Sequence, residues 1–592
     1  MISLRCLAFL FLLWGAIPAR SVTLQLQMQH TFAGEPLALD SLRYQNSAHE
    51  TLSVTRLSYL LSGFALQKSD GTWQELPGQV AWMSEDQHRT IARLPNVPPG
   101  NYLTLRFDVG LDAKTNTADT SKLAPNDPLN PERNGLHWSW QGNYIFVALE
   151  GLFRNGNEQP GGYVYHLAHD ANRTRINLAA PLDLTHDAAV TVNLDVATLL
   201  NAPHPLSFAR DGVSTHSRDG DPVATALAGN LPTAFRLVAV TSMLPQISQP
   251  SPLKPLYLPP TYTPYAFKMS ASFPIPELPR DNPLIVERVT LGDKLFHDDA
   301  LSRTHTVSCS TCHQADYAFA EPRPLSHGVD NRVGRRNAMP LFNLAWKSEF
   351  FWDGRAPSLR IQSLLPIRDH REMDTTLGQM VQNVAAKPEY AALFTAAYGT
   401  PEISVGRISL ALEQYVLTLT SFDSKFDRAL RGQAQFTDEE KHGLQLFTTE
   451  YDPRTRQYGA DCFHCHGGPL FTDHQFHNNG LDDLPLADLG RGAITREPSD
   501  NGKFATPSLR NVALTAPYMH DGRFKTLEEV VEHYNRGVHR TDTLDPNLAK
   551  HPAAGLQLSD ADKRALVAFL KTLTDPQYLA GPQVNGSLAE GK

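Results

Sequence analysis

Two copies of the pattern Cys-x-x-Cys-His, at residues 309–313 and 462–466, are the parts of this sequence best suited to chemistry. In such a pattern both thiols can add to the vinyl groups of a haem, and the adjacent histidine can bind the iron. A redox dithiol would not need the histidine. A four-ligand zinc site would need partner cysteines, but four of the five cysteines in the chain already lie in these motifs. The sequence therefore predicts two covalent c-type haems, attached through Cys309, Cys312 and His313 and through Cys462, Cys465 and His466.

The first 21 residues are typical of a cleavable secretory signal. They contain Arg5, an apolar run over 7–14 that is too short to span a membrane, and small residues around Ala19. The fifth cysteine, Cys6, precedes the apolar run, which disfavours a lipoprotein anchor. No later stretch is apolar for long enough to cross a bilayer, so we expect no transmembrane segment. A secretory signal together with covalent haem indicates the bacterial periplasm.

Charge and length narrow the remaining possibilities. The formal net charge is −9 at pH 7 and no basic run stands out, so we expect no nucleic-acid partner. A chain of 592 residues is long enough for three or four domains.

A Pro-rich stretch separates two halves of different hydrophobic periodicity. Eleven prolines lie between Pro245 and Pro283, a composition that suits either an extended spacer or an irregular strap packed on a domain surface. Apolar residues recur with period two before it and with helical spacing after it. We therefore predict a signal peptide at 1–21, an antiparallel, all-β sandwich at 22–241, a linker at 242–283, and two mostly α-helical, cytochrome-c-like lobes at 284–440 and 441–580.

Particular runs carry this division. Alternating strand patterns occur at Leu24 to Met28, Leu103 to Val109 and Val190 to Val196. One helical face comprises Ile408, Ala411, Leu412, Tyr415 and Leu419. A second helix is predicted to begin after the capping residues Ser559 and Asp562, with Leu566, Phe569, Leu570 and Leu573 facing inward.

Four further segments accompany the haem motifs, namely Leu291–Phe296, Phe351–Arg355, Pro507–Val512 and Pro517–Gly522. With these segments, the chain from residue 284 onward resembles the bacterial di-haem cytochrome c peroxidase family, and more closely its MauG-like branch. The resemblance implies that the haem on His313 reacts with peroxide and that the haem on His466 relays electrons. It also implies that Trp352 lies between the two haems, where an indole can pass or share oxidising equivalents.

The same resemblance assigns a distal pocket and a cation site. Pro366 and Glu372 match the proline and glutamate over the peroxidatic haem, and Gln362 matches a nearby pocket residue. A carboxylate there can move a proton between the two peroxide oxygens by general acid–base chemistry. The positions that bind calcium between the haems correspond to Asn337, Thr515 and Pro517, and oxygen ligands of this kind suit a hard cation.

Tyr534 distinguishes the two branches of the family. Peroxidases of the family have a methionine as second axial ligand fourteen residues after the histidine that corresponds to His520, whereas this chain has Tyr534 there. MauG-like enzymes have tyrosine at this position, and a phenolate stabilises higher-valent iron better than a thioether does. The alternative is a core role, because Leu527, Val530 and Tyr534 share one helix face.

His327 leaves a second question open. The segment Ser326–Gly328 resembles the loop whose histidine caps the peroxidatic haem in resting peroxidases, although its spacing to the haem motif and to Asn337 differs. MauG-like enzymes leave that iron open. His327 is therefore either an iron ligand or a histidine of a surface loop.

The N-terminal half carries a second set of motifs, at 127–131, 137–151, 163–166 and 230–235. Through them it resembles the copper-binding MbnP-like proteins found beside MbnH, a MauG-like enzyme that oxidises a tryptophan of its partner to kynurenine. The resemblance implies that Trp138 or Trp140 is the modified residue and that histidines complete a copper site. Imidazole suits copper, and the candidate ligands are His137, His166, His169 and His216.

These features favour a periplasmic di-haem oxidase that uses hydrogen peroxide to oxidise tryptophan in its own copper-binding domain. The first alternative is a cytochrome c peroxidase that takes electrons from a small cytochrome or a copper protein. Tyr534 argues against that alternative and His327 argues for it. The second alternative, a copper-handling or electron-transfer protein without catalysis, leaves the distal Glu372 and Pro366 without a purpose.

Overall fold

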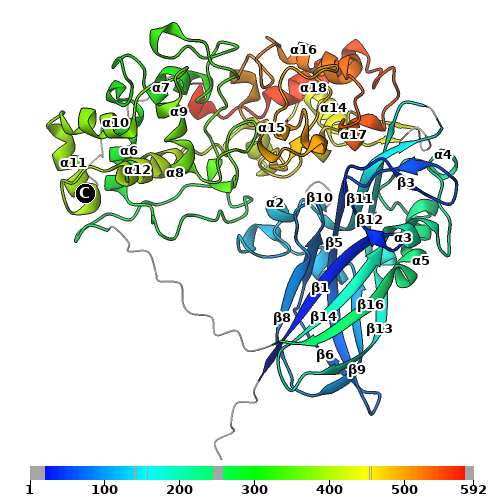
Figure 1. The fold of residues 1–592 in the computed structure, drawn as a ribbon. Helices are drawn as coiled ribbons and strands as arrows, with labels where there is room; N and C mark the ends of the chain where they lie inside the picture. Colours follow the sequence, from blue (N-terminus) through cyan, green and yellow to red (C-terminus); the bar gives the residue numbers. More distant parts are fainter. Residues whose placement is uncertain are drawn as a thin grey trace, which may run out of the picture.

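The computed structural model describes residues 21–138, 142–156, 158–243, 258–452, 454 and 456–579. The predicted signal peptide and Trp140 therefore lie outside the described residues, apart from residue 21. Figure 1 shows a β-rich N-terminal half that meets an elongated helical half at one of its ends, near α17 (Pro546–Ala549). This two-part architecture confirms the predicted fold class.

Two sheets form the β-rich half. The smaller has the order β16 (Phe235–Ser242), β14 (Ala188–Asp195), β1 (Val22–Phe32) and β2 (Glu35–Pro36), with β8 (Ile91–Val97) also beside β1. The larger has the order β13 (Thr174–Asp183), β9 (Asn101–Val109), β5 (Arg56–Lys68), β11 (Asn143–Arg154), β12 (Gly161–Ala168) and β15 (Ser214–Thr215). Short strands flank it, namely β3 (Tyr44–Gln45), β4 (Thr51–Leu52), β6 (Trp73–Glu75), β7 (Ala81–Ser84) and β10 (His137–Trp138).

The alternation of apolar and polar residues in the sequence predicted most of these strands. The structure differs from the prediction at two points. The prediction of a purely antiparallel sandwich was wrong, because β1 and β14 pair in parallel, with Leu24 opposite Ala188. Leu103 is 50 % exposed although the alternation predicted it inside. A register shift where β9 pairs with β13 changes the phase of the strand, so that Tyr102 points inward instead.

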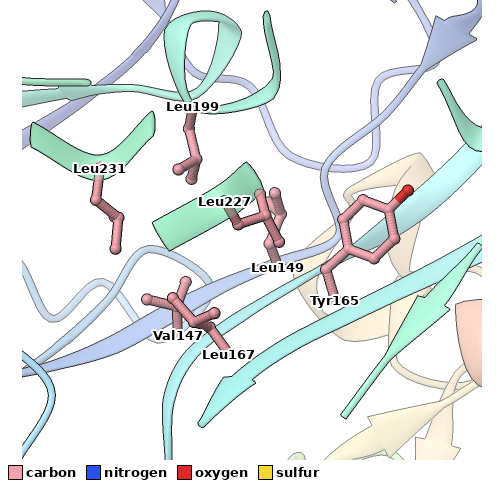
Figure 2. A pocket seen from close by; sticks show the side chains of 7 residues that line it. All are labelled: Val147, Leu149, Tyr165, Leu167, Leu199, Leu227 and Leu231. Atoms are coloured by element: carbon pink, nitrogen blue, oxygen red, sulfur yellow. The ribbon is translucent and has the colours of Figure 1, made fainter. Parts of the chain in front are cut away.

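Helices α3 (Val196–Asn201) and α5 (Pro222–Ala234) pack between the sheets and close the sandwich core. Figure 2 shows the small apolar cavity at this contact, lined by Val147, Leu149, Tyr165, Leu167, Leu199, Leu227 and Leu231. The hydroxyl of Tyr165 points away from the leucines and donates to the carbonyl of Gly212 at 2.7 Å. The cavity offers aliphatic surface without a reactive group, so it is part of the packing rather than a site.

The helical half consists of two lobes built around crossed helices. In the first lobe α6 (Val286–Phe296) crosses α12 (Val405–Leu417), where a Cβ on Gly292 would lie 2.0 Å from the carbonyl oxygen of Ala411. In the second lobe α14 (Asp438–Phe447) crosses α18 (Asp560–Lys571), where a Cβ on Gly443 would lie 1.9 Å from the carbonyl oxygen of Ala565. Glycine is required at both crossings because any side chain would separate the helices.

The helix predictions hold with one difference. Ser559 and Asp562 form the predicted capping box of α18, and Leu566, Phe569, Leu570 and Leu573 are buried. Helix α12 contains the predicted face but ends before Leu419. Further helices of this half are α7 (Cys309–Cys312), α8 (Leu359–Gln362), α9 (Leu365–Arg368), α10 (Leu377–Ala385), α11 (Glu389–Tyr398), α13 (Lys425–Leu430), α15 (Gly492–Thr495), α16 (Leu527–Glu532) and α17 (Pro546–Ala549).

The described part of the Pro-rich stretch packs against the helical half. Phe273 is fully buried, Arg510 lies over its ring at 4.7 Å, and Trp346 donates its indole N–H to the carbonyl of Pro274. Residues 258–283 therefore form an irregular strap on the haem lobes. No helix in the described part of the chain combines the length and hydropathy needed to cross a bilayer.

The sandwich docks on the second lobe through one end of β11, β12 and β15. A Cβ on Gly162 would lie 1.9 Å from the carbonyl oxygen of Pro546, so α17 touches the backbone of β12. Arg454 donates to the carbonyls of Asp211 and Ser214 from across the boundary. This contact brings the strands of one half beside the second haem motif of the other.

Candidate functional site

Both motif histidines are held in the same way. The Nδ1 of His313 lies 2.9 Å from the carbonyl oxygen of Phe319, and the Nδ1 of His466 lies 3.2 Å from that of Phe471. Both phenylalanines have a positive φ, 60° and 54°, which turns each carbonyl toward its ring. A carbonyl acceptor on Nδ1 fixes the tautomer that leaves Nε2 free as a ligand.

The motif cysteines fit covalent haem. All four are free, and none is paired in a disulfide. Burial raises the pKa of Cys309, Cys312 and Cys462 to about 12. The donor set is therefore complete in both lobes: two unpaired thiols and one imidazole whose Nδ1 lies against a backbone carbonyl.

The predicted distal residues lie on neighbouring segments, and Glu372 lies near the first motif. Gln362 ends α8, Pro366 lies in α9, and the backbone N–H of Met373 donates to the carbonyl of Pro366. Glu372 is close enough to Cys309 and Cys312 for its charge to add to the effect of burial in raising the pKa of both thiols. Burial, followed by the nearby charge of Asp369, raises the pKa of Glu372 to about 7. A carboxyl with such a pKa can both accept and donate a proton near neutral pH.

His327 lies on a turn that contacts this pocket. The backbone N–H of Val329 donates to the carbonyl of Glu372, and a Cβ on Gly328 would lie 2.3 Å from that oxygen. The Nδ1 of His327 lies 2.6 Å from the side-chain oxygen of Asn331, and its ring is half-buried. The loop is thus adjacent to the distal residues, which leaves both interpretations of His327 open.

Trp352 connects the two lobes. It is 8 % exposed, its indole N–H donates to the carbonyl of Asn337 at 2.9 Å, and its carbonyl accepts from the N–H of Ala505 in the second lobe. Asn337 in turn donates its backbone N–H to the carbonyl of His520. The Asn337 side-chain amide donates to the carbonyls of Arg323 and Pro324.

The other predicted calcium ligands lie on one segment of the second lobe. Thr515 is half-buried, its hydroxyl donates to the carbonyl of Val512, and Pro517 follows a cis peptide bond.

Tyr534 lies in a π-helical turn, His533–Gly537, that follows α16. Burial raises its pKa to about 12, and Cys465 and Cys462 are close enough to add to the shift. The amide of Asn479 donates to its hydroxyl at 3.4 Å. The phenol therefore faces the second haem motif rather than the hydrophobic core of the lobe.

A cluster of histidines lies where the halves meet. Ligand atoms of His166, His216 and His464 are all within 4.8 Å of one another. His166 and His216 come from the sandwich, whereas His464 lies inside the second haem motif, between Phe463 and Cys465. Trp138 is 2 % exposed and stacks on His216, with ring centroids 5.2 Å apart and planes inclined by 29°.

The remaining predicted histidines lie outside this cluster. The ring of His137 packs edge-on against Tyr144 at 4.7 Å, and burial lowers its pKa to about 4. His169 contacts the side-chain amide of Asn143, with its ring 6.2 Å from that of Trp138.

Comparison with known proteins agrees with this geometry. The profile described as "Di-haem cytochrome c peroxidase" matches residues 286–435. The methylamine utilization protein MauG of Methylophilus methylotrophus is 36 % identical over 312 residues, which cover 52 % of this chain and 87 % of that protein. The chain belongs to the di-haem cytochrome c peroxidase family. It is therefore an oxidoreductase of a family that carries two c-type haems and reacts with peroxide.

Further matches cover both halves of this di-haem peroxidase. The cytochrome c551 peroxidase of Pseudomonas aeruginosa is 34 % identical over 317 residues, 51 % of this chain and 84 % of that protein. The crystal structure of a MauG-like protein associated with microbial copper homeostasis is 34 % identical and covers 54 % of this chain and 98 % of its own, with a TM-score of 0.48. The MbnP profile matches residues 21–217, so the di-haem peroxidase carries an N-terminal MbnP domain.

His464 was missed by the sequence interpretation of this di-haem peroxidase. It occupies a variable position of a motif whose other residues account fully for haem attachment. The signal that could have found it is the extra histidine between Cys462 and Cys465. The first motif has Ser and Thr at its two variable positions, whereas the second has Phe463 and His464. Its partner residues Glu450 and Lys550 are isolated charges in the sequence, and only the fold brings them to it.

Proposed function

We propose that this di-haem enzyme uses hydrogen peroxide to oxidise Trp138 of its own MbnP domain to kynurenine. The observation that carries the proposal is the stacking of Trp138 on His216, whose ring lies 6.2 Å from Phe463 and 5.4 Å from His464 in the second haem motif. A short chain of aromatic rings thus joins the substrate residue to the relay lobe of the same polypeptide.

The first lobe receives the peroxide. A haem held there by Cys309, Cys312 and His313 would supply the iron for cleavage of the O–O bond. Glu372 accepts the proton of the incoming peroxide and returns it to the leaving oxygen, a role suited to a carboxyl whose pKa is about 7. Pro366 has no N–H to donate and so leaves Glu372 as the proton-transferring group beside it.

Two residues handle the oxidising equivalents between the lobes. Trp352, held by Asn337 and Ala505, shares charge across the lobe boundary. Tyr534, which lies near Cys462 and Cys465, would hold the haem of the second motif through its phenol oxygen.

The reaction balances with peroxide as oxidant. Conversion of tryptophan to N-formylkynurenine opens the bond between the two ring carbons of the pyrrole and adds two oxygen atoms. Two molecules of hydrogen peroxide are consumed and two of water are released. Hydrolysis then gives kynurenine and formate.

The test is mass spectrometry of the tryptic peptide Asn134–Arg154 before and after peroxide treatment of the haem-loaded protein. We expect the mass of kynurenine at Trp138, and no change in the same peptide of a Glu372→Gln variant. Trp82 is the matched internal control, because it is also 2 % exposed and lies in the same hydrophobic cluster. Modification of Trp82 to the same extent would show non-specific oxidation and would contradict the proposal.

A second candidate function is reduction of peroxide with electrons from a small cytochrome or copper protein. The contact between the His327 turn and Glu372 supports it, because a histidine beside the distal pocket can cap the iron in a resting enzyme. An unmodified Trp138 peptide, with peroxide consumed at the expense of a reduced cytochrome, would favour this function.

Two further assignments belong to the proposal. We propose a calcium ion at Asn337, Thr515 and Pro517, supported by the two hydrogen bonds that hold the Asn337 amide and orient its side-chain oxygen. Removal of calcium with a chelator should then perturb the haem spectrum, and restoring calcium should reverse the change. We also propose a periplasmic location, supported by the signal-like residues 1–21 and the two c-type haem motifs.

A further inference from the structure

We infer that His166, His216 and His464 form one copper site built from both halves of the chain, in which the second haem motif supplies a ligand. The copper candidates read from the sequence all lie in the MbnP domain. His464 belongs instead to the segment that attaches the relay haem. The inference does not depend on tryptophan oxidation, because the three imidazoles are present whether or not Trp138 is modified.

The first argument is geometric. The three ligand atoms lie within 4.8 Å of one another, close enough for a single ion to bind all of them. The side chains are nearly inaccessible to solvent, with exposures of 2 % for His166, 10 % for His216 and 4 % for His464. Three neighbouring imidazoles suit copper, and copper(II) is the divalent ion of its row that such ligands bind most tightly.

The second argument is that one of these rings presents an unsatisfied nitrogen. Within the described residues, His166 Nδ1 is buried and has no hydrogen-bond partner, whereas His216 Nε2 lies 3.1 Å from a carboxylate oxygen of Glu450. A buried polar atom without a partner costs free energy, so it calls for an explanation. A metal ion among the three rings would satisfy His166 Nδ1.

The third argument is the carboxylate behind His166. Glu150 Oε1 lies 2.9 Å from His166 Nε2, which leaves Nδ1 as the ring nitrogen available to a metal ion. Glu150 also accepts from Arg56 of the sandwich and from Asn547 of the second lobe. A carboxylate that orients an imidazole from behind is the usual outer shell of a histidine metal ligand.

Glu450 offers an oxygen ligand at the same place. Its Oε2 lies 3.1 Å from His216 Nε2 and 2.8 Å from His464 Nε2, and its Oε1 accepts from Ser214 of the sandwich. Lys550 contacts Glu450 as well, so the charge of this carboxylate is balanced even without an ion.

The competing explanation is a buried ion-pair network without metal. Lys550 contacts Glu450 and Asp461, and Asp461 also binds His551 at 2.7 Å. This network accounts for His464 Nε2, for His216 Nε2 and for the carboxylates. It does not account for the unpartnered Nδ1 of His166, which is why the metal site is the better explanation.

The experiment titrates copper(II), and separately zinc(II), into the full-length protein carrying both haems after removal of metals with a chelator. Affinity is measured by competition with the chelator, and the absorption of the relay haem is recorded at each step. We expect one tightly bound copper ion and a change in the haem spectrum as it binds. His464→Gln should lower the copper affinity by at least about 10–100-fold, the loss seen when even an outer-shell partner is removed.

Matched variants separate the ligand from its surroundings. Phe463→Leu changes the neighbouring position of the same motif, and His137→Gln removes a sandwich histidine that lies outside the cluster. Both should keep the wild-type copper affinity, and all variants are compared at two haems per chain. Trp138→Phe should also keep copper binding, which separates this inference from the proposed oxidation.

Three results would overturn the inference. The first is a His464→Gln protein that binds copper as tightly as the wild type, since the site would then belong to the MbnP domain alone. The second is a wild-type protein that binds no copper, since the histidines would then serve only the ion-pair network. The third is zinc binding tighter than copper, which would reject the assignment of the metal.

Discussion

The two haem lobes share one scaffold but differ in the residues that face the haem position. Each lobe has a helix crossing at a glycine, Gly292 or Gly443, and a motif histidine held by the carbonyl of a phenylalanine. Each also has an Asp-Gly-Arg turn, which starts at Asp353 in the first lobe and at Asp521 in the second. The repeat extends to the backbone, since Gly354 and Gly522 have φ of 71° and 69°.

The difference lies at the position twelve residues beyond each of these glycines. The first lobe has Pro366 there, with the Glu372 carboxyl beside it, and the second lobe has Tyr534. A proline offers neither a donor nor a ligand, whereas a phenol offers an oxygen to iron. We propose on this basis that the first lobe is open to peroxide and that the second is closed by its own side chain. The proposed difference in function between the two lobes therefore depends on only a few positions of a shared scaffold.

The lobes also differ in their neighbours. The MbnP domain docks on the second lobe, where Glu150 meets Asn547 and His216 meets His464. The lobe proposed to receive peroxide is thus not the lobe on which the MbnP domain docks. The proposed oxidation of Trp138 therefore needs oxidising equivalents to cross from one lobe to the other, which is the role proposed for Trp352 and Tyr534.

The largest expected effect comes from removing the proton-transferring group of the first lobe. Glu372→Gln should slow the reaction with peroxide by about 10²–10⁴-fold, the usual contribution of general acid–base catalysis. Stopped-flow absorption of the haems after mixing with peroxide measures the rate. Glu389→Gln, an exposed carboxylate of the same lobe, is the control. A rate unchanged in Glu372→Gln would place the proton transfer elsewhere.

The next effect concerns the second lobe. Tyr534→Met should raise the reduction potential of the relay haem, because a thioether favours the reduced iron more than a phenolate does. We expect oxidation of Trp138 to be lost and turnover with a reduced electron donor to increase. Spectroelectrochemistry and peptide mass spectrometry measure the two changes. Tyr518→Phe, which removes the hydroxyl of another half-buried tyrosine of this lobe, should change neither. A potential equal to the wild type would mean that Tyr534 belongs to the core.

The pH dependence of the reaction with peroxide should come from a residue of the first lobe, Glu372. The pKa of Glu372 is raised to about 7, and only its deprotonated form can accept the proton of peroxide. The rate should therefore rise with pH through about 7, falling about tenfold for each unit below it. In Glu372→Gln the rate should no longer rise with pH in this range, as measured by stopped-flow absorption at each pH. The same rise in Glu372→Gln would assign it to another titrating group.

The smallest effect tests the shared scaffold. Gly292→Ala and Gly443→Ala should each reduce stability by about 1–3 kcal/mol, since the new methyl group would overlap a carbonyl of the crossing helix. Denaturant titration followed by haem absorption measures both. Gly406→Ala on α12, where a Cβ meets open space, is the control and should not destabilise. A large cost in one lobe alone would show that the crossings are not equivalent.

The sequence by itself determined the features that depend on local order. The haem motifs are contiguous, the capping box of α18 spans four residues, and strand alternation needs only neighbouring positions. The same local information led to the division into a β-rich half and a helical half. It went wrong where pairing partners matter, as in the parallel pairing of β1 with β14 and the phase of Leu103.

Only the tertiary structure decided which distant residues share a site. His166, His216 and His464 are spread over almost three hundred residues, and their meeting depends on the close contact of Gly162 with α17. No periodicity or motif encodes that contact, because docking of two domains follows from the shape and charge of finished surfaces. For the same reason the sequence offered four sandwich histidines as copper ligands without separating them. In the structure only His166 and His216 lie together, and His464 of the haem motif lies beside them.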